Sequence, residues 1–375
     1  MNSYLLVTGD FVKTGGMDRA NFAVAEYLAK QGEQVHLVAY RVAAELLTYA
    51  NVRFHQVPKI ANSYLLSSPL LAQFGRIWAK KITAEGGRVL VNGGNCEWPD
   101  VNWVHYVHAA YQANQQVNWL RRSKTSFANK LSLHKERQAL ESATKIIVNS
   151  ERTKQDLIAR LNISKQKIHP IYYGIDPQVF YPVTADEKIA LRQHLGWNEN
   201  KPVVVFIGAL GDRRKGFDTL FAAWQKLCKS SHWDAKLVVI GSGAELPLWQ
   251  NRTANAGISS INFLGFRNDV PKLLQAADCL VAPTRYEAYG LGVHEALCCG
   301  LPALVSADAG VAEQYPEELQ ELLIPDPDHV TDLVTKLEKW YENQKGYTDI
   351  VLSIAQKLRS YTWDDMARSI QQLML

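Results

Sequence analysis

Residues 283–302 read PTRYEAYGLGVHEALCCGLP, and this stretch says most about the fold. An apolar run over Cys279–Pro283 ends where the stretch begins, and a helical pattern opens beside Gly290 and Gly292. A buried strand that leads through a glycine-containing loop into a helix is the repeating unit of a parallel α/β sheet. The stretch therefore predicts one strand–loop–helix unit of such a sheet.

Two glutamates lie in the same stretch, Glu287 in the predicted loop and Glu295 in the predicted helix. The start of a helix offers free N–H groups and the positive end of the helix dipole, so it can hold a phosphate. Carboxylates on either side can accept hydrogen bonds from sugar hydroxyls. The alternative is a surface glutamate and an ordinary helical one, and the pair Gly290 and Gly292 favours the ligand site.

Short apolar runs alternate with helical patterns on both sides of this stretch. Predicted strands in the first half are 4–8, 35–40, 52–57, 89–92, 101–106 and 145–149, with helices at 17–31, 72–84, 126–143 and 151–161. Predicted strands in the second half are 203–208, 236–241, 261–264, 279–283, 302–306 and 321–324, with helices at 217–229, 245–256, 270–277 and 292–299. This alternation predicts two doubly wound parallel sheets, and the strand count does not fit a (β/α)₈ barrel.

The run YYGIDPQVFYP, residues 172–182, ends regular structure with Gly, Asp and two prolines. We therefore expect an N-terminal domain over 1–176 and a C-terminal domain over 177–360. Residues 361–375 form a last predicted helix. Ligands of open parallel sheets sit at the carboxyl ends of the strands, so both domains are expected to present loops into a shared cleft.

Composition limits the function classes. The 375 residues are 47% hydrophobic and 21% charged, which excludes collagen-like and largely disordered chains. No apolar run reaches the ~20 residues of a membrane span, and MNSYLLVTGD is expected to be a first strand and not a signal peptide. The five cysteines show no metal-ligand spacing and favour a reduced, cytoplasmic protein without a metal site.

The net charge of +4 is unevenly divided, since residues 1–180 carry 22 Lys and Arg against 13 Asp and Glu. The later half carries 19 against 24. This pattern can be surface drift, or it can mean that the first half meets an anionic partner.

Two further glycine loops follow predicted strands. Gly15 and Gly16 precede the first helix and can seat a phosphate or a sugar hydroxyl, or they can form a plain turn. The run GALGDRRKGFD, residues 208–218, places three cations at the carboxyl end of a strand. Those cations can neutralise a leaving diphosphate, although a solvated basic loop is the alternative.

Together these segments resemble the retaining GT-B glycosyltransferases of family 4. The run EAYGLGVHEALCCGLP is similar to the E-x7-E signature of that family, whose glutamates match Glu287 and Glu295. The segments YYGIDPQVF, RRKGFDTLFAAW and FLGFRNDVPKLLQAAD resemble other segments of the family in the same order. The resemblance covers nearly the whole chain and implies two Rossmann-like domains facing across a cleft, with the last helix, 361–375, crossing back to the N-terminal domain.

The resemblance implies a role for particular residues. Glu295 would bind the ribose of the nucleotide and Glu287 the hydroxyls of the donor sugar. Lys215 would contact the diphosphate, and the backbone near Arg267 would read the base. The distal phosphate would lie on the amides around Gly290, Leu291 and Gly292, with Gly16 in the N-terminal glycine loop.

Two assignments stay open. The family often carries Gly-Arg-Leu where this chain has Ala209, so Arg214, or less favourably Arg213, would supply the missing charge. The family also places a histidine at the end of an N-domain strand. His105 and His108 in WVHYVHAAY both qualify, and strand alternation is expected to put them on opposite faces, with His105 matching better.

Two basic, aromatic stretches remain, at 64–81 and 119–137. They can be solvated helix faces, or they can meet anionic lipid headgroups or a lipid-phosphate-linked acceptor at the inner face of the plasma membrane. Neither has the spacing of a nucleic-acid module.

The function that follows is transfer of a hexose from a nucleotide sugar, with UDP-glucose the first expectation, to a glycan or lipid-linked acceptor in polysaccharide synthesis. No metal or other cofactor is expected. The alternatives are a nucleotide-sugar epimerase, a phosphorylase, or a non-catalytic protein that binds sugar nucleotides.

Overall fold

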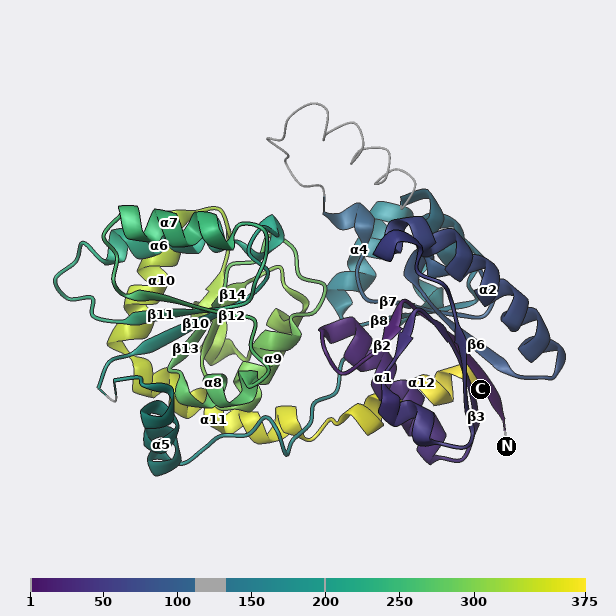
Figure 1. Cartoon of the computed structure of the whole chain (residues 1–375). Coiled ribbons are helices and arrows are strands. Elements are labelled where there is room, and N and C mark those ends of the chain that lie inside the picture. The colour runs from purple at the N-terminus through teal and green to yellow at the C-terminus, as the bar shows by residue number, and fades with distance from the viewer. Residues whose placement is uncertain (1, 112–132, 199) are drawn as a thin grey trace. The chain divides into compact units, whose positions relative to one another are not determined.

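A computed structural model of the chain describes residues 2–111, 133–198 and 200–375. Its internal contacts divide the chain into two compact units (Figure 1). Unit 1 comprises Met1–Gly174 together with Thr362–Leu375, and unit 2 comprises Ile175–Tyr361. The domain boundaries expected from the sequence fall within two residues of these divisions.

Unit 1 contains a seven-stranded parallel sheet in the order β5-β3-β1-β6-β7-β8-β9. A separate short pair joins β2 to β4. The strands of the unit are β1 (Ser3–Val7), β2 (Asp10–Phe11), β3 (Gln34–Ala39), β4 (Arg41–Val42), β5 (Val52–Gln56), β6 (Arg88–Asn92), β7 (Val101–Val104), β8 (Lys145–Val148) and β9 (Ile168–Pro170).

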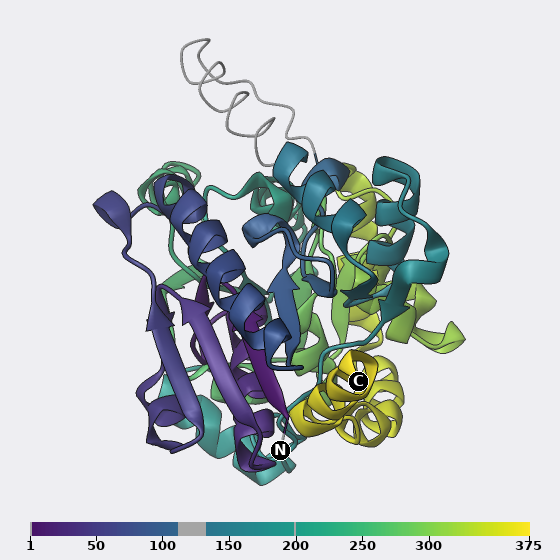
Figure 2. The same cartoon turned by 90° about the vertical axis from the view of Figure 1, so that its right-hand side faces the viewer.

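Helices cover both faces of this sheet, as alternation along its strands requires. Leu5 and Val7 of β1 pack with residues of helix α2 on one face (Figure 2). Tyr4 points the other way, and its hydroxyl accepts a hydrogen bond from Gln371 of α12. The helices of unit 1 are α1 (Gly16–Lys30), α2 (Tyr64–Ala84), α4 (Glu151–Leu161) and α12 (Trp363–Met374), and residues 133–142 are also helical.

Unit 2 contains a six-stranded parallel sheet in the order β12-β11-β10-β13-β14-β15. The central runs VVVFI and KLVVI are buried almost throughout, because helices cover the sheet on both sides. The strands are β10 (Val203–Ile207), β11 (Lys236–Ile240), β12 (Ile261–Gly265), β13 (Cys279–Ala282), β14 (Ala303–Ser306) and β15 (Leu323–Ile324).

Helices α6 and α7 lie on one face of the unit 2 sheet, and α8 and α9 lie on the other (Figure 1). A capping box between Thr184 and Glu187 starts α5, and Gly196 ends it in a left-handed conformation. The helices are α5 (Ala185–Leu195), α6 (Phe217–Leu227), α7 (Leu246–Asn255), α8 (Val270–Ala276), α9 (Leu291–Cys298), α10 (Val330–Glu342) and α11 (Gln344–Arg359).

The strand orders confirm the predicted fold class of two doubly wound parallel α/β units. Some details differ from the prediction. Helix α2 starts at Tyr64, eight residues before the expected start, because Ser63 caps it by accepting a hydrogen bond from the N–H of Leu66, and the helix continues through Pro69. The predicted helix 126–143 is described only from residue 133, and its earlier part lies outside the described residues.

Candidate functional site

The candidate site lies at the point where the strand order of the unit 2 sheet reverses. Strand β10 stands between β11 and β13, and the chain leaves β10 and β13 toward helices on opposite faces. Ligands of open α/β sheets bind in the crevice at such a point, at the carboxyl ends of the strands. The two loops that leave these strands, 208–216 and 283–290, carry four of the ten predicted site residues, and three more lie in helix α9, which follows the second loop.

These two loops touch through their main chains at Gly216. The residue has a φ of +69°, and a Cβ placed on it would lie 1.9 Å from the carbonyl oxygen of Pro283. Any other residue would therefore strain the backbone and force the loops apart. The glycine in the segment RRKGFDTLFAAW is thus required by the close approach of the two loops.

The close approach brings together two residues that are 72 positions apart in the sequence. Lys215 Nζ lies 2.6 Å from Glu287 Oε2. Their side chains keep 29% and 23% of their exposure, so both remain accessible from solvent. The structure thus joins the cation predicted to meet a diphosphate with the carboxylate predicted to meet a sugar.

Helix α9 begins beside this pair. Gly290 precedes the helix with a φ of +110°, and a Cβ there would lie 2.8 Å from Val311 Cγ1 and 3.4 Å from Glu287 Cγ. A Cβ on Gly292 would meet no atom within 4 Å, so the space above the first turn is open. The N–H groups of Leu291 and Gly292 come too early in the helix to have intrahelical acceptors. Such a helix start attracts an anion.

Glu295 follows one turn after Leu291, on the same side of α9, and its side chain is largely buried. His294, which immediately precedes Glu295 in α9, is buried, and its Nδ1 lies 2.9 Å from the hydroxyl of Tyr289. Burial lowers the pKa of His294 to about 4, so its ring is uncharged at neutral pH. The helix therefore presents one carboxylate and no histidine charge near its start.

Arg214, predicted to replace the family arginine, is held by Asp212. Its Nε lies 2.9 Å from Asp212 Oδ1, and its Nη2 lies 2.5 Å from Asp212 Oδ2. Burial alone would raise the pKa of Asp212, but the hydrogen bonds from Arg214 outweigh it and hold that pKa below its ordinary value. Much of the charge of Arg214 is therefore balanced within its own loop.

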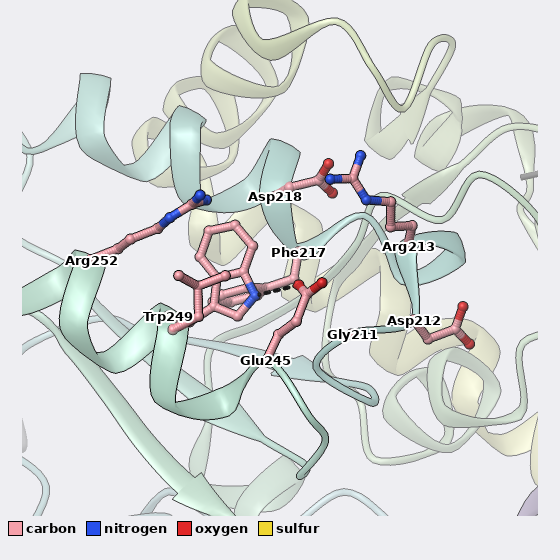
Figure 3. A pocket seen from close by; sticks show the side chains of 9 residues that line it. Gly211, Asp212, Arg213, Phe217, Asp218, Glu245, Trp249 and Arg252 are labelled. Carbon is pink, nitrogen blue, oxygen red and sulfur yellow. Dashed lines mark hydrogen bonds between the residues drawn. The ribbon is translucent and has the colours of Figure 1, made fainter. Parts of the chain in front are cut away.

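Arg213, the second choice for this role, lines a small pocket beside the same loop (Figure 3). Glu245 and Trp249 form another wall, and the indole Nε1 of Trp249 donates to Glu245 Oε2 at 3.2 Å. Arg252 covers the Trp249 ring at 4.8 Å. Sequence analysis found the wall formed by residues 211–218 but not the pocket, because the opposite wall, residues 245–252, comes from a separate segment that carries no motif.

Arg267, predicted to lie near the base, follows β12 at the same edge of the sheet. Its Nε lies 2.7 Å from Asp269 Oδ1, and the neighbouring Phe266 ring is mostly exposed. The strand order puts β12 two places from β10. This loop is thus farther from Lys215 than the loop of Glu287 is.

In unit 1, Gly16 is the first residue of α1, and Gly15 precedes it with a φ of +80°. Sequence analysis missed the carboxylates around this turn. Asp10 is buried and bonded to Arg41 and Tyr64, and Asp18 lies in the first turn of α1. Burial, with Asp10 adding to it, raises the pKa of Asp18 to about 6.

The two candidate histidines differ in burial. His105 is buried, and its Nδ1 lies 2.5 Å from the Tyr173 hydroxyl. Burial lowers the pKa of His105 to about 3, which leaves it uncharged. The half-exposed His108 lies 3.0 Å from Glu136. Because β7 ends at Val104, strand alternation does not reach either histidine.

Across residues 2–111, 133–198 and 200–375, no three His, Cys, Asp or Glu side chains gather as metal ligands would. Over the same described ranges, no helix has both the length and the apolar character needed to cross a membrane.

Two Rossmann-type units, one of which brings a cation, carboxylates and an open helix start together at its switch point, define a two-domain α/β protein. Family models identify it further. "Glycosyltransferase Family 4" matches residues 14–179, and "Glycosyl transferases group 1" matches residues 187–356. These ranges take in most of the chain, which belongs to this family of GT-B glycosyltransferases.

Known proteins agree with this assignment. An uncharacterized glycosyltransferase of Methanocaldococcus jannaschii is 29% identical over 60% of this chain and 57% of its own length. The D-inositol 3-phosphate glycosyltransferase of Salinispora tropica is 25% identical over 98% of this chain and 81% of its own length. The matched region thus spans little more than half of the archaeal relative.

Solved structures share the fold. WaaG, a glycosyltransferase involved in lipopolysaccharide biosynthesis, superposes with a TM-score of 0.80 at 20% identity, over 99% of each chain. Anabaena HepE, solved in complex with UDP and glucose, superposes with a TM-score of 0.70 at 18% identity, also over 99% of each chain.

Proposed function

We propose that this glycosyltransferase is a retaining enzyme that moves a hexose from a nucleoside-diphosphate sugar to a glycan or lipid-linked acceptor in polysaccharide synthesis. The proposed donor is a UDP-sugar, with UDP-glucose first. The observation that carries the proposal is the Lys215–Glu287 pair beside the start of α9. A cation, a carboxylate and an anion-binding helix start in one crevice match the parts of a nucleotide sugar.

Each group then has a task. Lys215 and the N–H groups of Leu291 and Gly292 hold the diphosphate, and Glu295 accepts hydrogen bonds from the ribose. Glu287 accepts hydrogen bonds from the sugar, and the backbone near Arg267 meets the base. Arg214 adds positive charge to the loop.

Two proposed residues belong to unit 1. Gly16 is given the role of a backbone seat at the start of α1. His105 is given the role of a neutral hydrogen-bonding group toward the donor sugar, since its buried ring carries no charge at neutral pH.

The chemistry needs no covalent intermediate. The bond between the anomeric carbon and the diphosphate oxygen breaks, and negative charge grows on the leaving phosphate. Fixed donors aimed at that charge stabilise the transition state more than the ground state. The acceptor hydroxyl attacks the same face and passes its proton to the leaving phosphate, which retains the anomeric configuration. No divalent metal enters this scheme, so activity is expected to survive EDTA.

The choice of UDP is supported by HepE, a protein of the same fold that was solved with UDP and glucose. The test is calorimetric titration of the chain with UDP, GDP and ADP. Tightest binding of UDP is expected, with a loss in Glu295→Ala, and equal binding of all three would contradict the proposed donor. Slow hydrolysis of UDP-glucose, followed by proton NMR, should release α-glucose first. Release of β-glucose would overturn retention.

A peripheral contact with an anionic membrane, at the inner face of the plasma membrane, is also proposed. Tyr64, Leu65, Leu66 and Ile77 of α2 are exposed apolar residues on a helix that also exposes lysines. Such a surface can bind acidic headgroups. The second predicted stretch, 119–137, lies outside the described residues up to residue 132.

Co-sedimentation with vesicles tests this contact. Binding to vesicles rich in phosphatidylglycerol is expected, with a clear loss in a Leu65→Ser, Leu66→Ser double variant. Equal binding of wild type and variant would remove α2 from the contact.

A further inference from the structure

Arg285 makes several hydrogen bonds within the candidate site, although nothing in the motif assigns it a role. It follows β13 and precedes Glu287 by two residues. Its guanidinium donates to both oxygens of Asp218, from Nη1 at 2.8 Å and from Nη2 at 2.9 Å. Its Nε donates to Asp328 Oδ1 at 2.6 Å, and its side chain keeps only 18% of its exposure.

Arg285 also donates hydrogen bonds to the main chain of the neighbouring loop. Its Nη1 donates to the carbonyl oxygen of Arg213 at 2.6 Å, and its own N–H donates to the carbonyl oxygen of Arg214 at 2.7 Å. These two carbonyls belong to the short 3-10 helix Arg213–Lys215. Arg285 therefore fixes the two peptide groups that immediately precede Lys215.

Arg285 also fixes the other side of that turn. Asp218 lies in the first turn of α6, and Thr219 Oγ1 lies 3.2 Å from Nη2 of Arg285. The guanidinium of Arg285 therefore holds the chain on both sides of Lys215, at Arg213 before it and at residues 218–219 after it. Its own loop is bound to the loop that carries Glu287, at Arg285 and at Gly216.

These contacts of Arg285 matter because, without them, the ligand would have to order the Lys215 side chain and both loops when it binds. A group held in place before binding spares the ligand that entropic cost. Planar guanidinium can bind a carboxylate with two parallel bonds and still donate to carbonyls, which an ammonium group cannot do.

We propose that Arg285 is a positioning residue that sets Lys215 and Glu287 for the donor diphosphate, without touching the donor itself. This inference rests on the proposed function, because it takes Lys215 as a donor contact. A positioning residue acts through its neighbour, so its effect must depend on whether Lys215 is present.

The experiment is a double-variant cycle measured as UDP affinity by calorimetry, with Lys215→Ala, Arg285→Ala and the double variant. Each single variant is expected to weaken UDP binding at least about tenfold. The double variant should bind no more than about twofold more weakly than Lys215→Ala alone. Arg285→Lys is a second variant, which keeps the charge and loses the fork, and it should bind nearly as weakly as Arg285→Ala.

A matched control stands at the opposite edge of the same sheet. Arg192 is also a buried arginine paired with an aspartate, Asp278, but it lies at the amino ends of β10 and β13. Arg192→Ala is expected to lower thermal stability at least as much as Arg285→Ala and to leave UDP affinity within about twofold.

The outcomes separate the two proposals. If Lys215→Ala binds UDP like wild type, the proposed donor site fails and the role of Arg285 falls with it. If Lys215→Ala weakens binding but Arg285→Ala and Arg285→Lys do not, only the positioning role is wrong. If Arg285→Ala lowers UDP affinity by the same factor in wild type and in Lys215→Ala, the positioning role is also wrong, because Arg285 would then act independently of Lys215.

Discussion

The unit 2 sheet carries one arginine–aspartate ion pair at the amino ends of its strands (the amino edge) and another at their carboxyl ends (the carboxyl edge). The two pairs hold different parts of the fold together. At the amino edge, Arg192 of α5 pairs with Asp278, whose carboxylate also accepts from the N–H of Val203 at 2.7 Å. At the carboxyl edge, Arg285 pairs with Asp218 and donates to the main chain of the next loop. The first cluster joins a helix to two strand ends, whereas the second joins two loops.

This difference teaches that a buried ion pair does not by itself mark a functional site. Lys188 and Asp278 at the amino edge, 2.8 Å apart, resemble Lys215 and Glu287 at the carboxyl edge, 2.6 Å apart, in distance and in exposure. Only the second pair stands where loops diverge from neighbouring strands and a helix start is open. The matched pairs allow direct tests.

The largest expected effect is on stability at the amino edge. Arg192→Ala removes a buried guanidinium that donates to Asp278 and to the carbonyl oxygen of Ala276, so that Asp278 keeps Lys188 as its paired cation, and it should lower the free energy of unfolding by about 3–5 kcal/mol. Its donor affinity should stay as in wild type, because no part of the cluster reaches the strand carboxyl ends. Urea denaturation and UDP titration of the same sample check both parts. A large loss of UDP affinity in folded Arg192→Ala would mean that the ion pair at the amino edge also affects the donor site.

The next largest effect is on rate at the carboxyl edge. Lys215→Ala removes a fixed charge from the leaving phosphate, so UDP-glucose turnover should fall about 10²–10³-fold. The control is Lys188→Ala, which breaks the matched pair at the amino edge and should leave turnover within about twofold. Turnover is followed as released UDP. Similar rates in both variants would show that the position of the pair is irrelevant.

Two glycines with similar backbone angles sharpen the comparison further. Gly216 and Gly196 have φ values of +69° and +65°, but only a Cβ on Gly216 would collide, at 1.9 Å from the Pro283 oxygen. Gly196→Ala should cost about 1 kcal/mol of stability for its backbone conformation alone. Gly216→Ala should cost about 2–3 kcal/mol and also weaken UDP binding, since it separates the loops.

Chemical denaturation and UDP titration measure both glycine variants. A Gly216→Ala protein that binds UDP as tightly as wild type would mean that the contact between the loops does not organise the site.

At neutral pH the smallest expected effect is at His294, whose influence on stability appears only on acidification. Burial lowers the pKa of His294 to about 4, below its ordinary 6.5, so the unfolded chain takes up this proton more readily than the folded chain. The stability that the folded chain gains from keeping His294 neutral is therefore complete above pH 6.5. It is lost as the pH falls toward 4, at up to about 1.4 kcal/mol per pH unit. His294→Leu should flatten the pH profile of unfolding between pH 6.5 and 4.5. An unchanged slope would mean that His294 is not buried as described.

Much of the fold could be predicted from local patterns, and the exceptions have physical causes. Strands β10 and β11 are buried on both faces and read as continuous apolar runs, so they were found. Strand β9 is three residues long and ends in Pro170, which gives too little pattern to recognise. Helix α5 has few buried residues and thus no apolar stripe, so it was missed.

The site was predictable as a set of loops but not as a set of contacts. Glycines after strands and the E-x7-E spacing identified the segments of Lys215, Glu287 and Glu295. No local pattern could show that Arg285 would hold the loop of Lys215. Such partners depend on how two distant loops pack, which spacing along the chain does not encode.

The most direct test of the account is calorimetric titration of UDP into wild type, Lys215→Ala and Lys188→Ala. We predict one UDP site per chain in wild type, at least about tenfold weaker binding in Lys215→Ala, and wild-type affinity in Lys188→Ala. Binding that is absent in wild type, or equal in Lys215→Ala and wild type, would contradict a donor site at the carboxyl edge of the unit 2 sheet.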